Sequence, residues 1–291
     1  MSRPGAVPLA LFMPPYRWLA PISTGGQALD SAFVAGGALV WCMAESRRPR
    51  EFRIVRDRPG GVALIAILPP AKSLGEGDIL RLVERCRPHS VLPYHPEPDP
   101  EDLAVVLRRP PEALPVDLVD YLTWRGVRVD GDTRQLIRKT IELSEGIRTV
   151  SGLARALYLS RRALGRRFLT RGLPAPSHWL QFGRALRAAI RLQASDDNLF
   201  TIATDLGYPD GFALSNQMKR LMGTRPSTIR ECLGWEWVVE AWLRMERDAG
   251  TLRFDLNGSA GKPARRVAEV LASGGGDDGL IEQRPALQPG G

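Results

Sequence analysis

The most informative segment of the chain is Ile202-Ala-Thr-Asp-Leu-Gly-Tyr-Pro-Asp-Gly-Phe-Ala-Leu-Ser-Asn-Gln-Met-Lys-Arg-Leu-Met-Gly-Thr-Arg-Pro226. Its pattern predicts two short helices with a tight break between them. Gly207 can end the first helix, because glycine tolerates the left-handed conformation that closes a helix, and Asp210 can cap the second. The apolar stripe of the second helix has the spacing i, i+4, i+7 and consists of Leu214, Met218 and Leu221. The segment therefore predicts a helix-turn-helix.

A second copy of this pattern lies upstream. Leu153–Leu157 matches Ile202–Leu206 at an offset of 49 residues. The cap and the stripe then match at an offset of 50, in the pairs Ser160 with Asp210, Leu164 with Leu214, and Phe168 with Met218. The one-residue difference falls in the turn, where changes in length are best tolerated. Such a repeat is far harder to obtain by chance than either copy alone, and it predicts two units joined by a long helix over Ser177–Ala194.

Positive charge is concentrated on this repeat. The chain carries a net charge of +8, whereas residues 149–230 hold 13 Lys or Arg against four Asp, a local charge of +9. The rest of the chain is therefore slightly acidic. A basic surface confined to one module is the electrostatic footprint expected for a partner with a phosphate backbone.

Composition limits the class of protein. With 291 residues and 44% hydrophobic content, the chain has the length and the apolar material for two ordinary globular domains. Three scattered cysteines imply no disulfide framework. The N-terminus lacks the uninterrupted apolar core of a signal peptide, and no stretch approaches the ~20 apolar residues that cross a bilayer. We therefore expect a cytoplasmic protein without a membrane partner.

The region before the repeat has an α/β pattern. Val62–Leu68 is short, rich in branched residues and bounded by Gly and Pro pairs, which predicts a buried parallel strand. Asp78–Cys86 predicts an amphipathic helix, Ser90–Tyr94 a second strand, and Pro100–Leu107 a second helix. Ala32–Ala44 is continuously apolar and fits either a buried strand or a short helix.

The sequence predicts an α+β, multi-domain chain. Residues 1–128 are expected to form an α/β N-terminal domain, which opens with a partly ordered, Pro- and Gly-rich lead-in over residues 1–27. Residues 129–246 are expected to form an all-α domain with the two helix-turn-helix units. Its aromatic helix over Trp235–Trp242 is expected to pack within the chain. Residues 247–291 are of low complexity and predict a disordered tail.

The order of elements in the N-terminal domain resembles a reduced response-regulator receiver domain. A receiver domain carries its phosphorylatable Asp at the end of the central strand, but here that strand ends Ala66-Ile-Leu-Pro-Pro70. The resemblance therefore implies a scaffold or interaction domain and not a phosphorylation switch. The alternative is an α/β domain whose role the sequence does not reveal.

The helical region, over residues 133–230, resembles the AraC/XylS family of transcription regulators, in which one long helix joins two helix-turn-helix units. Ser160–Phe168 resembles the family pattern S-x-x-x-L-x-R-x-F, and Arg184 with Ala188 resembles its R-x-x-x-A. Ile202–Pro226 resembles I-A-x3-G-F-x-D-x3-F-x3-F-K-x3-G-x-T-P. The resemblance implies sequence-specific binding of double-stranded DNA and regulation of transcription, with RNA polymerase as a candidate partner.

Three features depart from the family pattern. Leu214 and Met218 stand where Phe is usual, which is a conservative change in a core. Leu173 stands at the usual glycine after the first recognition helix and Gly172 lies one position early, so we expect that helix to end differently. The N-terminal region shows no pattern of the sugar-binding cupin domain. The small-molecule effector is therefore unknown, or there is none, and no cofactor is expected.

The family resemblance places the second helix of each unit in the major groove, where base edges can be distinguished. In the first unit, four arginines surround Gly165 on the side away from the predicted core. Arg162 and Arg166 are one turn apart and are the candidates for contacting bases, because Arg can bond guanine bidentately. Arg161 and Arg167 are expected to hold phosphates. The alternative is that the four are only a solvated face.

The second recognition helix is less charged. Asn216 is suited to adenine and Lys219 to a phosphate. Phe212 fits two roles, contact with a thymine methyl group or packing against the joining helix. Gly211 and Ser215 complete the surface that we predict to face DNA.

Other classes of function find less support. No Gly-rich phosphate loop follows the Val62–Leu68 strand and no Ser-centred nucleophile elbow is present, so an enzyme is not expected. Cys86, His89 and His95 lie close in sequence but match no zinc spacing. The alternative to DNA binding is a structural or interaction protein whose helical module binds another protein, and the concentrated charge disfavours it.

Overall fold

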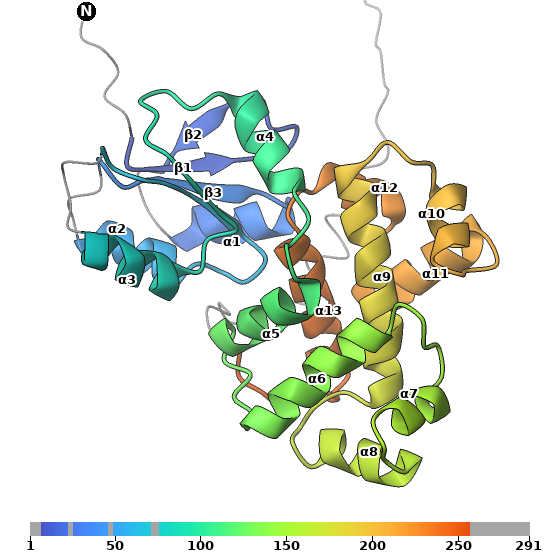
Figure 1. Ribbon diagram of the computed structural model, residues 1–291. Helices are drawn as coiled ribbons and strands as arrows, with labels where there is room; N and C mark the ends of the chain where they lie inside the picture. The colour runs from blue at the N-terminus through green and yellow to red at the C-terminus, as the bar shows by residue number, and fades with distance from the viewer. Residues whose placement is uncertain (1–6, 23–25, 46–48, 71–75, 257–291) are drawn as a thin grey trace, which may run out of the picture. The chain divides into compact units, whose positions relative to one another are not determined.

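A five-stranded mixed sheet forms the first part of the computed structural model, which describes residues 7–22, 26–45, 49–70 and 76–256 (Figure 1). The strands are β1 (Leu9–Phe12), β2 (Leu19–Pro21), β3 (Ala38–Cys42), β4 (Ala63–Ile67) and β5 (Ser90–Leu92). They lie in the order β2-β1-β3-β4-β5. Strands β3, β4 and β5 run parallel, whereas β1 pairs antiparallel with both β2 and β3. Every residue of β4 is buried, as its run of apolar residues predicts for a central parallel strand.

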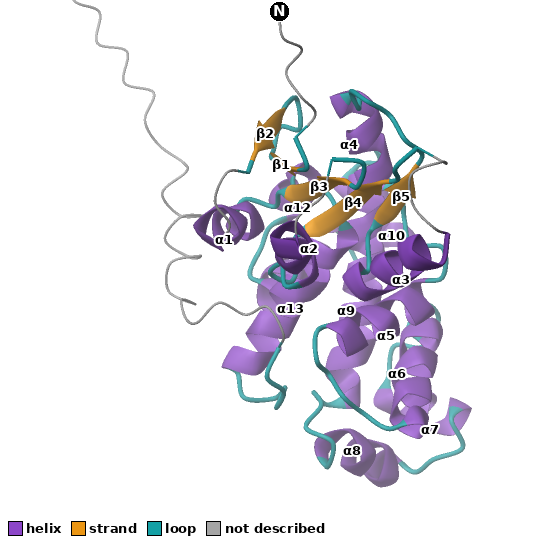
Figure 2. Ribbon diagram, turned by 90° about the vertical axis from the view of Figure 1, so that its left-hand side faces the viewer, coloured by secondary structure: helices purple, strands orange, loops and turns teal. Residues whose placement is uncertain are grey.

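Helices cover both faces of this sheet (Figure 2). Helices α1 (Gly26–Val34), α2 (Pro49–Arg56) and α3 (Glu76–Cys86) lie on one face, and α4 (Pro100–Arg108) lies on the other. Because successive side chains of a strand point to opposite faces, β3 contributes to two cores. Its Leu39 and Trp41 face α1 to α3, and its Val40 faces α4.

The α/β prediction for this region is confirmed, but several details of it are wrong. Part of the expected lead-in forms β1 and β2, since β1 pairs along its whole length with β3. Helix α2 was not predicted, although Phe52 and Val55 lie three residues apart and both join the core. The apolar stretch Ala32–Ala44 contains both alternatives, namely the end of α1 and the whole of β3.

The resemblance to a receiver domain does not extend to the strand directions. The strand order equals that of flavodoxin-like sheets, in which all strands run parallel. Here β1 runs antiparallel to β3, and residues 13–18 join it to β2 without a helix. Only the segment from β3 through α2, β4 and α3 to β5 has alternating helices and parallel strands.

The second part of the described chain is helical, as predicted. Two connecting helices lead into the repeat, α5 (Leu114–Trp124) and α6 (Gly131–Leu143). The first unit consists of α7 (Val150–Ala156) and α8 (Arg161–Leu169), and the second of α10 (Leu199–Asp205) and α11 (Gly211–Met222). The joining helix is α9 (Pro176–Ala194), with one unit toward each of its ends (Figure 1). Two further helices follow, α12 (Pro226–Glu231) and α13 (Trp235–Asp248).

Helix α13 packs inside the chain, which confirms the prediction for its aromatic stripe. Trp242 stacks on Phe182 of α9, with ring centroids 4.0 Å apart and an interplanar angle of 7°. Trp237 donates its indole N–H to the carbonyl of Phe33 at 3.0 Å. Trp235 meets the ring of Tyr121 with 5.7 Å between centroids. One continuous core therefore runs from the sheet face through α13 into the helical repeat.

Two carboxylates of α13 are buried in ion pairs with earlier parts of the chain. Glu240 receives hydrogen bonds from Nε and Nη2 of Arg125, both at 2.8 Å, and neither side chain is more than 1% exposed. One turn earlier, Glu236 bonds Nδ1 of His89 at 2.9 Å. The other ring nitrogen of His89 faces the carbonyl oxygen of Val106 at 3.2 Å. Because both nitrogens face acceptors, only the imidazolium form satisfies both bonds.

Among the described residues, no helix combines the length and the apolar character that crossing a bilayer requires. The predicted disordered tail begins too early at residue 247, because α13 continues to Asp248 and the side chains of Leu252 and Leu256 are buried. The disorder predicted beyond residue 256 lies outside the residues that the structure describes.

Candidate nucleic-acid interface

Side-chain caps fix the start of all four helices of the repeat. Ser160 caps α8 by accepting a hydrogen bond from the N–H of Ala163 at 3.1 Å, and Asp210 caps α11 through the N–H of Ala213 at 2.7 Å. The first helices are capped in the same way, α7 by Thr149 and α10 by Asn198. The cap pair Thr149 and Asn198 keeps the 49-residue offset, so the repeat extends further upstream than its apolar pattern showed.

The predicted cores of the two recognition helices are correct. Leu164 and Phe168 of α8 and Leu214 and Met218 of α11 are all fully buried. Phe168 meets Trp179 of α9 with 6.3 Å between ring centroids. This packing fixes which side of each recognition helix is left for solvent or for a ligand.

The four arginines of α8 lie on that open side. The guanidinium groups of Arg161, Arg162, Arg166 and Arg167 are exposed, and none has a hydrogen bond or ion pair to another residue of the described ranges. Gly165 is half-buried, and a Cβ built on it would meet no atom within 4 Å. The space around Gly165 is therefore open to a ligand that approaches the arginines.

Helix α11 presents a different surface. Asn216 and Lys219 are exposed and Ser215 is half-buried. Phe212 is 83% exposed, so the alternative that it packs against α9 is wrong. A Cβ built on Gly211 would lie 3.3 Å from Cγ of Leu199, which leaves little room for a side chain where α11 approaches α10. The predicted contact residues thus form an exposed face with one cation and one amide.

The turns of the two units share a hydrogen-bond pattern but differ in their surroundings. Tyr158 occupies the left-handed position of the first turn with φ 54°, and Gly207 occupies that of the second with φ 69°. A Cβ on Gly207 would meet only the guanidinium end of the exposed Arg148 side chain, which can move aside, so the left-handed φ is what favours glycine there. Tyr158 is 97% exposed. The extra residue of the second turn is Pro209, which follows the buried Tyr208.

Arginines of α9 hold the second unit in place. Arg191 donates Nε to Asp197 at 2.7 Å and Nη1 to Asp205 of α10 at 2.6 Å. The hydrogen bonds that Arg191 donates to the carboxylates of Asp205 and Asp197 raise the pKa of Arg191. Arg184 lies over the ring of Tyr208 with 4.4 Å from Cζ to the centroid. The arginines of α9 therefore stabilise the position of the second unit and do not face a ligand.

The structure separates the basic side chains of the repeat that are open to a ligand from those that contact other residues of the chain. Six of the 13 basic side chains in residues 149–230 contact other residues of the chain, namely Arg171, Arg184, Arg187, Arg191, Arg220 and Arg230. Arg171, for example, bonds Asp130 and, with bonds from Thr133, lowers the pKa of that carboxyl to about 2. The other seven make no such contact among the described residues, and four of them lie on α8. The basic surface that a phosphate backbone would meet is thus concentrated on the first recognition helix.

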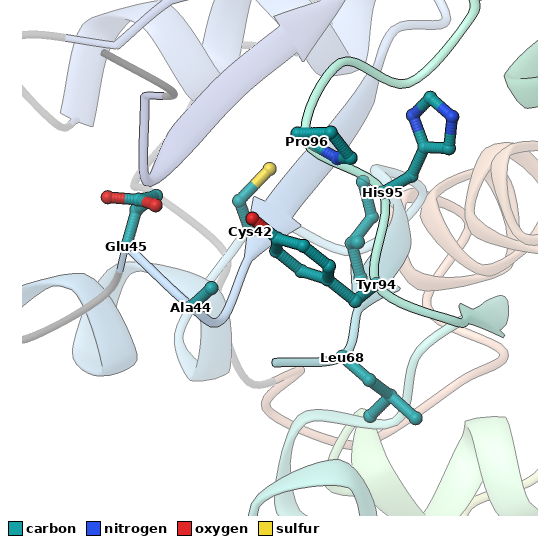
Figure 3. Close-up of a pocket in the computed structure, with 8 residues that line it drawn as sticks. Cys42, Ala44, Glu45, Leu68, Tyr94, His95 and Pro96 are labelled. Carbon is teal, nitrogen blue, oxygen red and sulfur yellow. The ribbon is translucent and has the colours of Figure 1, made fainter. Parts of the chain in front are cut away.

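A small cavity lies at the carboxyl ends of β3 and β4, the place where a receiver domain would be phosphorylated. Cys42, Glu45, Leu68, Tyr94 and His95 are among the residues that line it (Figure 3). Its volume is about 10 Å³, which is room for one water molecule. Burial raises the pKa of the Cys42 thiol. This cavity is too small for an effector.

A larger cavity of about 280 Å³ lies where the start of α13 meets the α3–β5 turn and the α4–α5 connection. Arg87, Arg109, Glu112, Trp235 and Glu236 are among its lining residues. Its volume approaches the lower end of the range for small-molecule sites. Within the described residues no group of His, Cys, Asp or Glu could hold a metal ion, and His89 is instead paired with Glu236.

Comparison with known proteins agrees with this geometry. A family described as a helix-turn-helix domain matches residues 153–231. The chain is also 35% identical over 86 residues to the raffinose operon transcriptional regulatory protein of Pediococcus pentosaceus. That alignment covers 30% of this chain and 31% of the relative, so the two proteins share less than a third of their length. No significant match to a solved structure was found.

The fold and the matches together define a DNA-binding class of domain, a tandem helix-turn-helix around one joining helix. More specifically, residues 153–231 form a helix-turn-helix domain of the AraC/XylS type.

Proposed function

We propose that the chain binds double-stranded DNA sequence-specifically and regulates transcription, with α8 and α11 each entering a major groove. The observation that carries this proposal is the pairing of two buried, capped helix-turn-helix units with an open face of four exposed arginines on α8. The matched relative is a transcriptional regulatory protein, which supports the same conclusion. The domain type is that of regulators and not of enzymes.

Within α8, Arg162 and Arg166 contact bases and Arg161 and Arg167 hold phosphates. Arg carries a rigid fork of donors that matches O6 and N7 of guanine, so the pair selects guanine at two positions. The open space over Gly165 lets the edge of a base approach the helix. The alternative of a merely solvated face leaves the concentration of exposed cations on one helix without a cause.

Within α11, Asn216 selects adenine, Lys219 holds a phosphate, and Phe212 contacts a thymine methyl group, with Gly211 and Ser215 beside them. The 83% exposure of Phe212 supports this role, because an aromatic side chain in water stabilises the fold little. The two recognition helices then meet successive grooves, roughly 34 Å apart along one face of the duplex. The site on DNA is asymmetric, with two recognition elements for each protein chain.

The division of labour along the chain follows from this proposal. Residues 129–246 act as the DNA-binding domain and residues 1–128 as the domain that receives signals or contacts RNA polymerase. A small-molecule effector, where one is used, occupies the 280 Å³ cavity, because Trp235 and Glu236 line it and α13 packs on α9 and α11. A DNA partner also agrees with the expected cytoplasmic location.

The test is selection of bound duplexes from a random library by the full chain, followed by footprinting and a salt titration. We expect one enriched sequence with two protected elements per chain. Contacts of Arg161, Arg167 and Lys219 with phosphates predict that log K falls with log[salt] with a slope of roughly −3 or steeper. An unenriched library would contradict the proposal and favour the alternative, a protein partner for the helical module.

A further inference from the structure

The turn of the first unit holds a side chain that its backbone does not favour. Tyr158 has φ 54°, in the left-handed region where any residue with a Cβ is strained. Both turns close with the same pair of backbone hydrogen bonds, which run to Arg155 and Ala154 in the first unit and to Thr204 and Ala203 in the second. The second unit places Gly207 at this position and avoids the strain.

No contact within the described residues compensates for the strain at Tyr158. Its ring is 97% exposed and has no aromatic neighbour, and its hydroxyl has no hydrogen-bond partner there. The neighbouring position of the second turn is filled by Tyr208, which is buried beneath Arg184. A strained backbone with an aromatic ring in water is a pattern found at functional sites.

The position of Tyr158 indicates what the ring contacts. It lies two residues before Ser160, the cap of α8, and three before Arg161, which we expect to hold a phosphate. In a bound helix-turn-helix unit the first helix crosses the phosphate backbone and the start of the recognition helix enters the major groove, so the turn between the two helices lies near the backbone. A tyrosine there can donate its hydroxyl to a phosphate oxygen and pack its ring on deoxyribose.

We propose that Tyr158 is a DNA-contacting residue that positions the first unit on the phosphate backbone. This inference rests on the proposed function of α8. A contact with the backbone carries no sequence information, so its loss weakens binding to every duplex and leaves the preferred bases unchanged. That outcome separates Tyr158 from Arg166, whose loss relaxes the preference for one base.

The experiment compares the full chain with its Tyr158→Gly, Tyr158→Phe and Tyr158→Ala variants. The probes are the duplex that the wild-type chain enriches and a duplex of scrambled sequence, each labelled for fluorescence anisotropy. We expect Tyr158→Gly and Tyr158→Ala to raise Kd about three- to tenfold on both duplexes, and Tyr158→Phe to lie between them and the wild type. Trp18→Ala, which removes an exposed aromatic ring from the N-terminal part, serves as the matched control and should change neither Kd.

The glycine variant also separates a contact with DNA from a defect in folding. Glycine relieves the strained φ, so Tyr158→Gly should unfold at a higher temperature than the wild type while it binds DNA more weakly. Variants that bind as tightly as the wild type would overturn the role of Tyr158 and leave the proposed function intact. A wild-type chain that binds no duplex would overturn both.

Discussion

The two helix-turn-helix units are copies in sequence, yet their surfaces differ. The first has a nine-residue recognition helix with four exposed arginines, and its turn is open to solvent. The second has a twelve-residue recognition helix with one exposed amide and two exposed cations, Lys219 and Arg220, of which Arg220 bonds Gln181. Its turn lies against Arg148 and Arg184. A repeat therefore preserves caps and core positions while its surface residues diverge. The first unit has the composition for affinity and base selection, and the second is held firmly to the joining helix.

The largest expected effect is the loss of stability when a core side chain of either unit is truncated to alanine. Phe168→Ala should destabilise the chain by about 3–5 kcal/mol and Met218→Ala by about 2–5 kcal/mol, because both side chains are fully buried. Phe168 also touches Trp179, so its loss should be the greater one. Urea unfolding of both variants measures this. A larger loss for Met218→Ala would mean that the second unit holds the stronger core.

The next largest expected difference between the two units is in their preference for particular bases. Arg166→Ala should weaken binding to the enriched duplex by about 1–3 kcal/mol and relax the preference at one position. Asn216→Ala should relax a position in the other half of the site by a smaller amount, since a neutral amide makes weaker hydrogen bonds than a cation. Arg155→Ala is the matched control, because it removes an exposed cation outside the recognition helices. Repeating the duplex selection with each variant tests this, and an unchanged preference for Arg166→Ala would remove its assigned role.

The turns should respond in opposite directions to substitution. Gly207→Ala should destabilise the chain by about 1–2 kcal/mol, because alanine is strained at this φ. Tyr158→Gly should stabilise it by about 0.5–1 kcal/mol, the relief of strain being partly offset by the flexibility of glycine in the unfolded chain. Thermal unfolding of the two variants checks the signs. Two changes of the same sign would show that the turns are not equivalent.

The smallest expected effect is a pH dependence that reaches the second unit through α13, which packs on α11. Burial disfavours the charged forms, but the pairing with Glu236 outweighs it and raises the pKa of His89 above 6.5. Burial also disfavours the charged form of Glu236, but the pairing with His89 outweighs burial and lowers the pKa of Glu236 below 4.5. The stabilisation by the pair should therefore be complete between about pH 4.5 and 6.5. It should be lost as pH rises through the raised pKa of His89 or falls through the lowered pKa of Glu236.

Comparison of the melting temperature of the wild type with that of His89→Gln from about pH 5 to pH 9 isolates the contribution of the pair. The partly exposed His178 pairs with the buried Glu246, and their pKa values shift in the same directions as those of His89 and Glu236. This second pair remains in both proteins as a common background. A difference between the two proteins that stays constant from pH 5 to pH 9 would show that His89 does not change its charge there.

Local sequence rules were sufficient for the caps and the core stripes of the two helix-turn-helix units. Ser160 and Asp210 cap helices, and Leu164 and Leu214 are core residues, because caps and stripes depend on positions three or four residues away. The same rules could not place β1, a four-residue strand among prolines whose partner β3 lies far along the chain. The direction of β1 likewise depends on the whole sheet.

Charge was the least predictable part of the site. Arg191 and Arg166 are equivalent residue types in a basic module, and only the structure shows that Arg191 binds Asp197 and Asp205 while Arg166 is exposed. The buried Glu240 was missed for the same reason, since its partner Arg125 lies 115 residues earlier. A hint was present in the aromatic helix, where glutamates stand four residues apart on a face rich in tryptophan.

The buried ion pair of Glu240 with Arg125 limits how this chain can be divided in protein engineering. A fragment that begins at residue 129 would contain α13 without Arg125, Tyr121 and His89. It would therefore lose the Arg125 partner of Glu240 and the His89 partner of Glu236, leaving Arg244, at 3.5 Å, as the remaining ion-pair partner of Glu240 among the described residues, and two tryptophans would lose their partners. Removing one partner of such a pair is strongly destabilising, because a charge is left in an apolar site. We therefore expect the helical module to be unstable on its own, and a chimera that borrows it should also carry the chain from His89 through Arg125 or replace the acidic residues of α13.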